Sequence, residues 1–352
     1  MVDLTRRTLL AGSVPVVGAG AALLHSQVPH AHPWETEAAA ASEGAHGGHG
    51  SNAATGTHGG HANFRDGAEV DHRGNGFDPH QLVRDFDWGT TRRLPNGRTL
   101  REWTLIAGEQ EIEVAPGVRF AAWSYNGRVP GPTLRCREGD RLRIRFVNGS
   151  RHPHTIHFHG IHPAEMDGVA GVGAGEIAPG GRTVYEFDAL PVGLHLYHCH
   201  VRPLAEHIAK GLYGTFVVDP RDGREPADEL VMVMNGFDTN FDRANELYAA
   251  NTVPFAYMNR PIRVRRGELV RLYLVNVLEY DLINSFHLHG NLFEYFPTGT
   301  GRRAAELTDT VMLCQGQRGI AEWRFPYAGK FMFHAHQSEF TELGWQGFFE
   351  VV

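Results

Sequence analysis

The stretch LRCREGDRLRIRFVN at Leu134–Asn148 returns in altered form as IRVRRGELVRLYLVN at Ile262–Asn276. Each copy has a glycine turn followed by a run with the apolar pattern of a β-strand. Two further pairs of segments follow in the same order: HTIHFHG (154–160) with NSFHLHG (284–290), and GLHLYHCH (193–200) with GKFMFHAH (329–336). The chain is therefore a tandem duplication of one folding unit.

Turn signals separate strand-like segments from Trp103 to the C-terminus, among them Asn126-Gly127 and Pro130-Gly131. The chain contains 42 Gly and 19 Pro, and it shows no long amphipathic helix pattern. We therefore predict an all-β fold of two tandem Greek-key β-sandwich domains, each of about 130 residues. The predicted domains are residues 81–222 and residues 223–352.

Composition excludes some classes of function. The 352 residues carry a formal net charge of -7, so no strong positive field is available to hold nucleic acid. Three cysteines are too few for a disulfide framework. The 22 histidines, in contrast, are a large excess for an ordinary core and direct attention to metal binding.

The N-terminal segment, residues 1–37, has a basic pair, Arg6 and Arg7, before an uncharged stretch from Thr8 to Leu24. This stretch is shorter than the roughly 20 residues that span a bilayer. It resembles a Tat signal, so we predict export to the periplasm or the cell exterior and no stable membrane span. Residues 38–80 are rich in Gly and His and are predicted to be disordered. Their AHGGHG and THGGHA motifs either bind copper loosely or belong to a plain solvated linker.

Four H-x-H pairs stand at matching places in the two copies. In a strand, residues i and i+2 face the same side, so each pair presents two imidazoles in one direction, as a metal requires. Imidazole suits copper, zinc, iron and nickel alike, so the pairs alone do not identify the metal. The pairs are His157/His159, His198/His200, His287/His289 and His334/His336.

A second set of ligands is expected behind the histidines of the first copy. His154 and Cys199 each face away from the neighbouring H-x-H histidines, because they stand at odd spacings from them. His207 follows as a second imidazole. Two His, one Cys and a weak or absent axial ligand are typical of a blue type 1 copper centre. In the second copy Asn284 and Ala335 occupy the corresponding positions, so we predict that this site has been lost there.

These motifs, in this order and in register with the repeat, resemble the two-domain multicopper oxidases, also called small laccases, with the blue copper in the first domain. The likeness covers about residue 98 to the C-terminus. It implies two cupredoxin domains and four coppers per chain: one type 1, one type 2 and two type 3. The implied ligands are His154, Cys199 and His207 for type 1, with Leu212 at the axial position; His157 and His287 for type 2; and His159, His198, His200, His289, His334 and His336 for type 3.

The resemblance implies a laccase-like activity, in which one-electron oxidation of phenolic or similar donors is coupled to reduction of dioxygen to water. The chain has seven Met and no Met-rich insertion, which favours a phenolic donor over a metal ion, although a metal ion stays open. Asp167 resembles the family's acid near the type 2 copper, and Glu339 or Glu342 could supply protons from the other side. In the family, the first domain of one subunit meets the second domain of its neighbour, which implies a homotrimer with interfacial clusters.

Leu212 stands where many members of the family have methionine. Because leucine cannot coordinate a metal, we predict a blue site of relatively high reduction potential. Cys136 and Cys314 replace apolar positions in strand-like runs and are predicted to be packed thiols.

Two alternatives stay open. Copper-containing nitrite reductases resemble this chain at His154 and Cys199, but they have Asp where this chain has His157 and no His corresponding to His200. A non-catalytic copper-binding or electron-carrier protein is suggested by the His-rich tail, and oxygen uptake would separate it from an oxidase.

Overall fold

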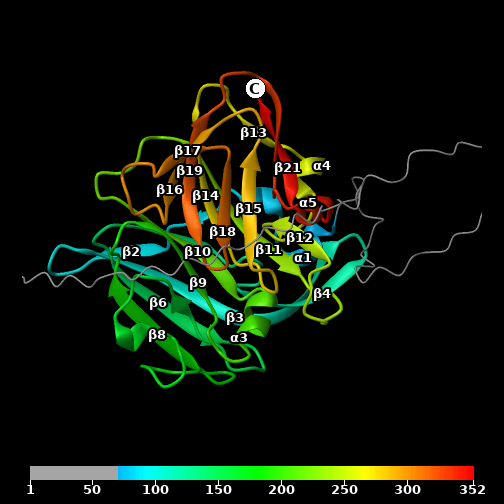
Figure 1. Ribbon diagram of the computed structural model, residues 1–352. Coiled ribbons are helices and arrows are strands. Elements are labelled where there is room, and N and C mark those ends of the chain that lie inside the picture. Colours follow the sequence, from blue (N-terminus) through cyan, green and yellow to red (C-terminus); the bar gives the residue numbers. More distant parts are fainter. Residues whose placement is uncertain (1–69) are drawn as a thin grey trace, which may run out of the picture. The chain divides into compact units, whose positions relative to one another are not determined.

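The computed structural model describes residues 70–352, which are built mainly from β-strands (Figure 1). The first domain contains β1 (Phe86–Asp87), β2 (Thr90–Arg93), β3 (Thr99–Ala115), β4 (Val118–Tyr125), β5 (Thr133–Arg137), β6 (Arg141–Asn148), β7 (His157–Phe158), β8 (Arg182–Asp188), β9 (Gly193–His198) and β10 (Tyr213–Asp219). The second contains β11 (Asp228–Phe237), β12 (Leu247–Ala250), β13 (Ile262–Val264), β14 (Leu269–Asn276), β15 (Ile283–Leu288), β16 (Phe293–Pro297), β17 (Glu306–Thr308), β18 (Thr310–Cys314), β19 (Arg318–Arg324), β20 (Gly329–His334) and β21 (Gln346–Val351).

The helices of the described residues are short, as the absence of a helical pattern predicts. They are α1 (His72–Asn75), α2 (Pro79–Leu82), the 3₁₀ turn η2 (Ala164–Met166), α3 (Leu204–Ala209), α4 (Ala256–Asn259) and α5 (Ser338–Glu342).

Each domain contains two sheets, and the duplication is visible in their strand orders. The order β5-β10-β9-β7 of the first domain reappears as β13-β21-β20-β15 in the second, and β3-β6-β8 reappears as β11-β14-β19. The pairs β5/β10 and β13/β21 are both parallel, as are β3/β6 and β11/β14. Parallel neighbours among antiparallel strands require the chain to cross between the sheets of a sandwich. The predicted all-β fold of two tandem cupredoxin-like domains is confirmed.

The repeated segment that predicts the fold is buried differently in its two copies. In β6, Leu142, Ile144 and Phe146 are fully buried while the residues between them are not. In β14 every residue is buried, because its second face, which carries Tyr273 and Val275, packs into an apolar cluster shared by the two domains. The charged residues of β6 and the mainly apolar sequence of β14, in which Arg271 is the one charged residue, match these two environments.

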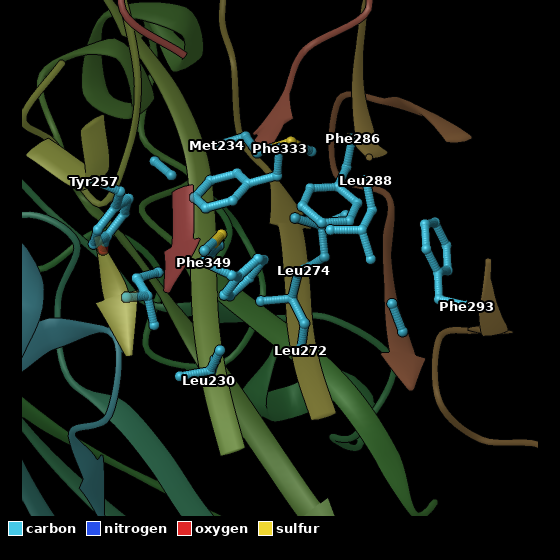
Figure 2. Close-up of a cluster of buried hydrophobic side chains, with 14 of the residues drawn as sticks. Leu230, Met234, Tyr257, Leu272, Leu274, Phe286, Leu288, Phe293, Phe333 and Phe349 are labelled. Atoms are coloured by element: carbon cyan, nitrogen blue, oxygen red, sulfur yellow. The ribbon is translucent and has the colours of Figure 1, made fainter. Parts of the chain in front are cut away.

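Three large apolar clusters hold the described residues together. One is the core of the first domain, and a second is the core of the second domain, where Figure 2 shows Phe286, Phe333 and Phe349 gathered beside Leu272 and Leu274. The third cluster draws side chains from both domains. Burial of this shared cluster stabilises the contact between the two domains within one chain.

A buried charge network also crosses between the domains. The guanidinium of Arg135 in β5 donates to Asp219 at 2.6 Å and to Glu229 in β11 at 2.6 Å. Arg135 is buried, and Arg271 in β14 donates to the same Glu229 carboxylate at 3.1 Å. Removing one partner of such a network leaves a buried charge unpaired, which typically costs about 3–5 kcal/mol.

The structure differs from the sequence prediction near the start of the described residues. Residues 70–80, which the sequence assigns to the disordered tail, include α1 and the start of α2. The Asp71 carboxylate caps α1 by accepting from the Gly74 N–H, and the Asn75 side chain bonds to the backbone of Glu113. Phe77 joins the shared apolar cluster. A few anchoring side chains thus order a segment whose overall composition is that of a linker.

Residues 1–69 lie outside the described part of the chain, and with them the predicted export signal and most of the predicted His-rich linker. Within the described residues no helix is long and apolar enough to cross a membrane.

Candidate metal centre

The H-x-H pairs of the first domain are brought together by the pairing of β7 with β9. This antiparallel pairing sets His157 directly opposite His198. The ring centroids of His157 lie 5.0 Å from His159, 5.3 Å from His198 and 5.2 Å from His200. Ligand nitrogens of His157, His159 and His198 lie within 4.8 Å of one another. We call these four side chains the first histidine face.

In His157 and His198 of this face, Nδ1 is held by the protein, and Nε2 is available to a ligand. His157 Nδ1 lies 2.9 Å from the Asp167 carbonyl oxygen and 2.8 Å from its carboxylate, and His198 Nδ1 lies 2.8 Å from the Cys199 carbonyl oxygen. His159 Nε2 and His198 Nε2 are only 2.9 Å apart. Carbonyl and carboxylate partners on one ring nitrogen fix the ring and leave the other nitrogen free to bind a metal.

Burial keeps these imidazoles in the form that binds metals. It lowers the pKa of His159 to about 3 and the pKa of His198 to about 4, and it lowers the pKa of His157 as well. The rings of His159 and His198 are therefore neutral at neutral pH, and a neutral imidazole is the ligand that a metal requires.

A pocket of about 270 Å³ lies in front of the first histidine face. Its opposite wall comes from the second domain of the same chain and includes Glu279, Gln315 and Gly316. Burial raises the pKa of Glu279 to about 7, although the hydrogen bond to Gln315 opposes this shift. Glu279 could not be predicted from the sequence, because nothing in the repeat shows which loops of the second domain cover the first.

The second domain carries a matching group, the second histidine face, formed by His287, His289, His334 and His336. The pairing of β15 with β20 sets His287 opposite His334. The ring centroids of His287 lie 4.9 Å from His289, 5.2 Å from His334 and 5.5 Å from His336, and His289 Nε2 lies 2.9 Å from His334 Nε2. His289 and His336 are exposed. The two faces therefore share one internal geometry and differ in their access to solvent.

His287 is held from behind in its own way. Its Nδ1 lies 2.9 Å from the Asp309 carbonyl oxygen and 2.8 Å from the Thr310 hydroxyl. Asp309 thus occupies the place that Asp167 has behind His157. Asp309 could not be predicted by analogy with Asp167, because Asp309 stands 22 residues after His287 whereas Asp167 stands 10 residues after His157.

The predicted thiol cluster forms behind the first histidine face. Cys199 Sγ lies 3.2 Å from His207 Nδ1 and 3.7 Å from His154 Nδ1, and the two imidazole nitrogens are 3.2 Å apart. The Thr155 N–H donates to the sulfur at 3.4 Å. Leu212 is fully buried, and its carbonyl oxygen accepts from the Cys199 N–H. The structure thus brings together His154, Cys199 and His207, which are separated in the sequence.

This donor set fits copper. A point equidistant from the three atoms lies about 2 Å from each of them, which is a normal length for metal bonds to imidazole and slightly short for thiolate. Burial lowers the pKa of His154 to about 3 and that of His207 to about 4, so both rings are neutral. Burial raises the pKa of the Cys199 thiol to about 11, so a metal that binds here displaces a proton.

Comparisons with known proteins agree with this donor set. Two family models, both described as multicopper oxidase, match residues 107–223 and residues 224–352, one for each half of the duplication. The chain belongs to the multicopper oxidase family. Membership implies an oxidoreductase that uses copper.

Solved structures and curated sequences place this multicopper oxidase among several relatives. A crystal structure of a multicopper oxidase is 61% identical, with a TM-score of 0.80, and the match covers 81% of this chain and 100% of that one. The blue copper oxidase from Nitrosomonas europaea is 27% identical, with a TM-score of 0.65, over 72% of this chain and 86% of its own. The copper-containing nitrite reductase of Neisseria meningitidis is 29% identical over 65% of this chain, and the match spans only 63% of its length.

The second domain of this multicopper oxidase has filled the place of a thiol cluster with packed side chains. Asn284 and Ala335 stand where the first domain has His154 and Cys199, as predicted. The backbone N–H of Trp345 donates to the Phe340 carbonyl oxygen, just as the backbone N–H of Leu212 donates to the His207 carbonyl oxygen. Phe340 therefore corresponds to His207, and Trp345 corresponds to Leu212. Phe340 and Trp345 are buried in the core of the second domain. Aromatic bulk thus occupies the volume that a metal site would need.

Other predicted residues fall in different surroundings. Glu339 and Glu342 both lie in α5, and both are exposed. Burial raises the pKa of Tyr248, and the carboxylates of Asp281 and Glu339 add to this rise. The predicted role of Glu339 and Glu342 in proton supply stays a prediction. Cys136 is buried and free, as expected. The expectation that Cys314 is packed is wrong, because its thiol is exposed at the end of the edge strand β18.

Leu212→Met is expected to lower the reduction potential of the copper-loaded thiol cluster in this multicopper oxidase. Leu212 is fully buried beside the cluster, and a thioether there adds a weak ligand that favours the oxidised metal. A redox titration of the blue absorption measures the shift, with Leu212→Ile as the control that keeps an apolar side chain. An unchanged or higher potential in the methionine variant would rule out the axial position.

Proposed function

We propose that this protein is a laccase-like multicopper oxidase that takes single electrons from phenolic or similar donors and reduces dioxygen to water. The observation that carries this proposal is the position of Cys199 between His198 and His200. Three consecutive residues therefore connect the thiol cluster, through Cys199, to the first histidine face, through His198 and His200. When bound, four coppers per chain would supply the storage of electrons and the chemistry of dioxygen.

The chain's own residues divide into three ligand groups on this proposal. His154, Cys199 and His207 would hold the type 1 copper, with Leu212 as an apolar cap. His157 and His287, each with Nδ1 bonded to a backbone carbonyl, would hold the type 2 copper. The type 3 ligands would be His159, His198, His200, His289, His334 and His336.

Two carboxyl groups lie close to the first histidine face. Asp167 Oδ1 lies 2.8 Å from His157 Nδ1 and 3.5 Å from His162 Nε2. Glu279 lines the pocket from the other side, and its raised pKa of about 7 keeps a substantial fraction protonated at neutral pH. Reduction of dioxygen to water consumes protons, so an acid in the pocket wall and a carboxyl group behind His157 suit this chemistry.

An eight-histidine cluster needs a second copy of the chain. In the described residues, the ligand groups that lie within 4.8 Å draw their histidines from one domain only, and the wall opposite the first face carries no histidine. The strand and loop that lead to the second face expose large apolar side chains, with Leu282 89% exposed and Met312 of the paired strand 67% exposed. Such an apolar patch beside open ligands supports a contact between subunits. We infer a ring of three chains with three shared clusters.

Mixing two inactive variants tests this sharing. One chain carries His157→Ala with His159→Ala, and the other carries His287→Ala with His289→Ala. Each variant alone is expected to be inactive. Co-expressed and isolated as assemblies that contain both chains, they should regain about a third of the wild-type oxygen consumption, because each mixed ring of three has one contact in three that joins two intact faces.

The mixed sample is purified through two different affinity tags, so that only assemblies containing both chains are assayed. Mixtures of each variant with itself provide the matched controls. Oxygen consumption that stays at the level of the single variants in the doubly tagged assemblies would place each cluster within one chain.

The similarity to copper-containing nitrite reductases makes nitrite reduction the competing function. One copper-loaded preparation is assayed for oxygen consumption with 2,6-dimethoxyphenol and, without oxygen, for nitrite reduction with the same donor. The proposal predicts rapid oxygen consumption and little nitrite reduction. The reverse result would assign the chain to the reductases, and neither activity would leave a copper-binding or electron-carrier protein.

A further inference from the structure

The thiol cluster has almost no direct access to solvent among the described residues. His154, Cys199 and Leu212 are fully buried, and His207 is 3% exposed. Trp123 of β4, which is 8% exposed, packs against both imidazoles. Its ring centroid lies 5.2 Å from His154 at an interplanar angle of 64° and 4.8 Å from His207 at 70°. An external donor therefore meets at most a small edge of His207.

Trp123 also contacts side chains that reach the surface. The His152 ring lies 4.7 Å from it at 35°, and the His152 side chain is 52% exposed. Lys210 Nζ lies 5.3 Å from the Trp123 ring and 4.6 Å from the ring of Phe241, which is 60% exposed. We call His152, Lys210 and Phe241 the surface patch. Trp123 joins this patch to both imidazoles of the thiol cluster.

The equivalent positions in the second domain show which of these side chains are needed for packing. The backbone N–H of Trp123 donates to the Lys210 carbonyl oxygen, and the backbone N–H of Tyr248 donates to the Leu343 carbonyl oxygen. Tyr248 is therefore the counterpart of Trp123, and Leu343 is the counterpart of Lys210. Tyr248 stacks on Phe340 at 4.0 Å and 19°. An aromatic ring at this position therefore serves packing in both domains. The lysine does not, because leucine replaces it in the domain that has no thiol cluster.

We propose that Trp123 carries the electron from an external donor to the His154–Cys199–His207 cluster, and that the donor is a small phenol seated on the surface patch. This proposal rests on the oxidase function proposed above. The ammonium of Lys210 attracts an electron-rich ring or a phenolate, and the rings of Phe241 and His152 offer flat contacts to the donor. A metal cation would instead be repelled by Lys210.

The step balances with the oxidised copper as the electron acceptor. The phenol would lose one electron, which would pass through the indole of Trp123 to a Cu(II) ion held by His154, Cys199 and His207; as the oxidant, that ion would become Cu(I). Its phenolic O–H bond breaks, the proton goes to solvent water, and a neutral phenoxyl radical leaves. No bond forms between donor and protein.

Anaerobic stopped-flow reduction of the blue absorption by 2,6-dimethoxyphenol tests the electron path without turnover. Trp123→Leu is expected to slow the second-order reduction by at least about tenfold, while Trp123→Tyr retains most of the rate because its ring keeps a conjugated path. The copper content, blue absorption and reduction potential of each variant should match those of the wild type. Trp323→Phe is the matched control, because Trp323 is also buried and its indole N–H has no hydrogen-bond partner in the structure.

A second variant tests the seat of the donor. Lys210→Met is expected to raise severalfold the dissociation constant of 4-nitrophenolate, a probe whose electron-poor ring resists oxidation, measured by absorption at equilibrium. Reduction by the phenol should slow at low donor concentration and recover at high concentration. Because Lys210 touches no ligand directly, the reduction potential should stay unchanged.

The outcomes distinguish this proposal from the function it rests on. A wild-type protein without blue absorption would remove the oxidase function itself. Normal blue absorption with equal or faster reduction in Trp123→Leu would show that Trp123 shields the cluster and does not conduct. Unchanged 4-nitrophenolate binding in Lys210→Met would move the donor away from the surface patch.

Discussion

Cys199→Ser is expected to abolish the blue absorption and to lower oxygen consumption by roughly a thousandfold. Cys199 Sγ is the one sulfur among three converging donor atoms, and a serine hydroxyl cannot supply the thiolate on which the blue colour depends. The histidine faces do not use this side chain. The variant should therefore keep about three of four coppers per chain, as measured by elemental analysis beside visible absorption and oxygen uptake.

Cys136→Ser is the matched control for this experiment. Cys136 is a free thiol that is fully buried in the same core, and burial raises its pKa as well. Its replacement tests the loss of a buried thiol without the loss of a ligand, so colour and turnover should persist. An intense blue absorption that survives in Cys199→Ser would refute the assignment of the type 1 site.

His336→Ala is expected to reduce oxygen consumption by about 100-fold or more while the blue absorption remains. His336 belongs to the second histidine face, with its ring 5.5 Å from that of His287, whereas the thiol cluster is formed by residues of the first domain. Losing this imidazole removes one ligand from the site of dioxygen reduction. Oxygen consumption and the blue spectrum are measured on the same copper-loaded sample.

The control for this variant is His72→Ala. His72 lies in α1 and belongs to neither histidine face, so its loss should leave oxygen consumption near the wild-type value. Full activity in His336→Ala would remove the second domain from the catalytic cluster and leave its four histidines without a role in the reaction.

Local sequence predicts much of this molecule because its two main signals are local. The repeat shows the duplication, and the spacing of His157 and His159 shows that both rings share one side of a strand. The same rule predicts that Cys199 faces away from His198 and His200. The structure adds that strand pairing sets His157 opposite His198, which joins two separate motifs into one face.

Contacts between domains could not be predicted from these signals. Glu279 reaches the first histidine face only because the shared apolar cluster and the Arg135–Glu229 pair hold the second domain against the first. Trp123 lies far from the cluster in sequence, and only the folded β4 brings it to His154 and His207. Long-range packing of this kind leaves no periodic pattern in the chain.

A difference in segment length also prevents the sequence alone from showing which residues of the two copies correspond. The segment after the last histidine is longer in the first domain, so residue spacing does not align His207 with Phe340. The equivalent backbone hydrogen bonds of Leu212 and Trp345 show that relation directly. The segment that contains α1 and α2 is a similar case, because a few side chains anchor it: Phe77 packs into the shared cluster, and Asn75 hydrogen-bonds to the backbone of Glu113.

The copper content of the reconstituted protein tests the central claim most directly. Protein loaded with copper and freed of unbound metal is analysed for copper and for chain concentration in the same sample. The account predicts close to four coppers per chain, one for the thiol cluster and three for each pair of joined histidine faces. A content well below four, such as two coppers per chain in fully loaded protein, would contradict it.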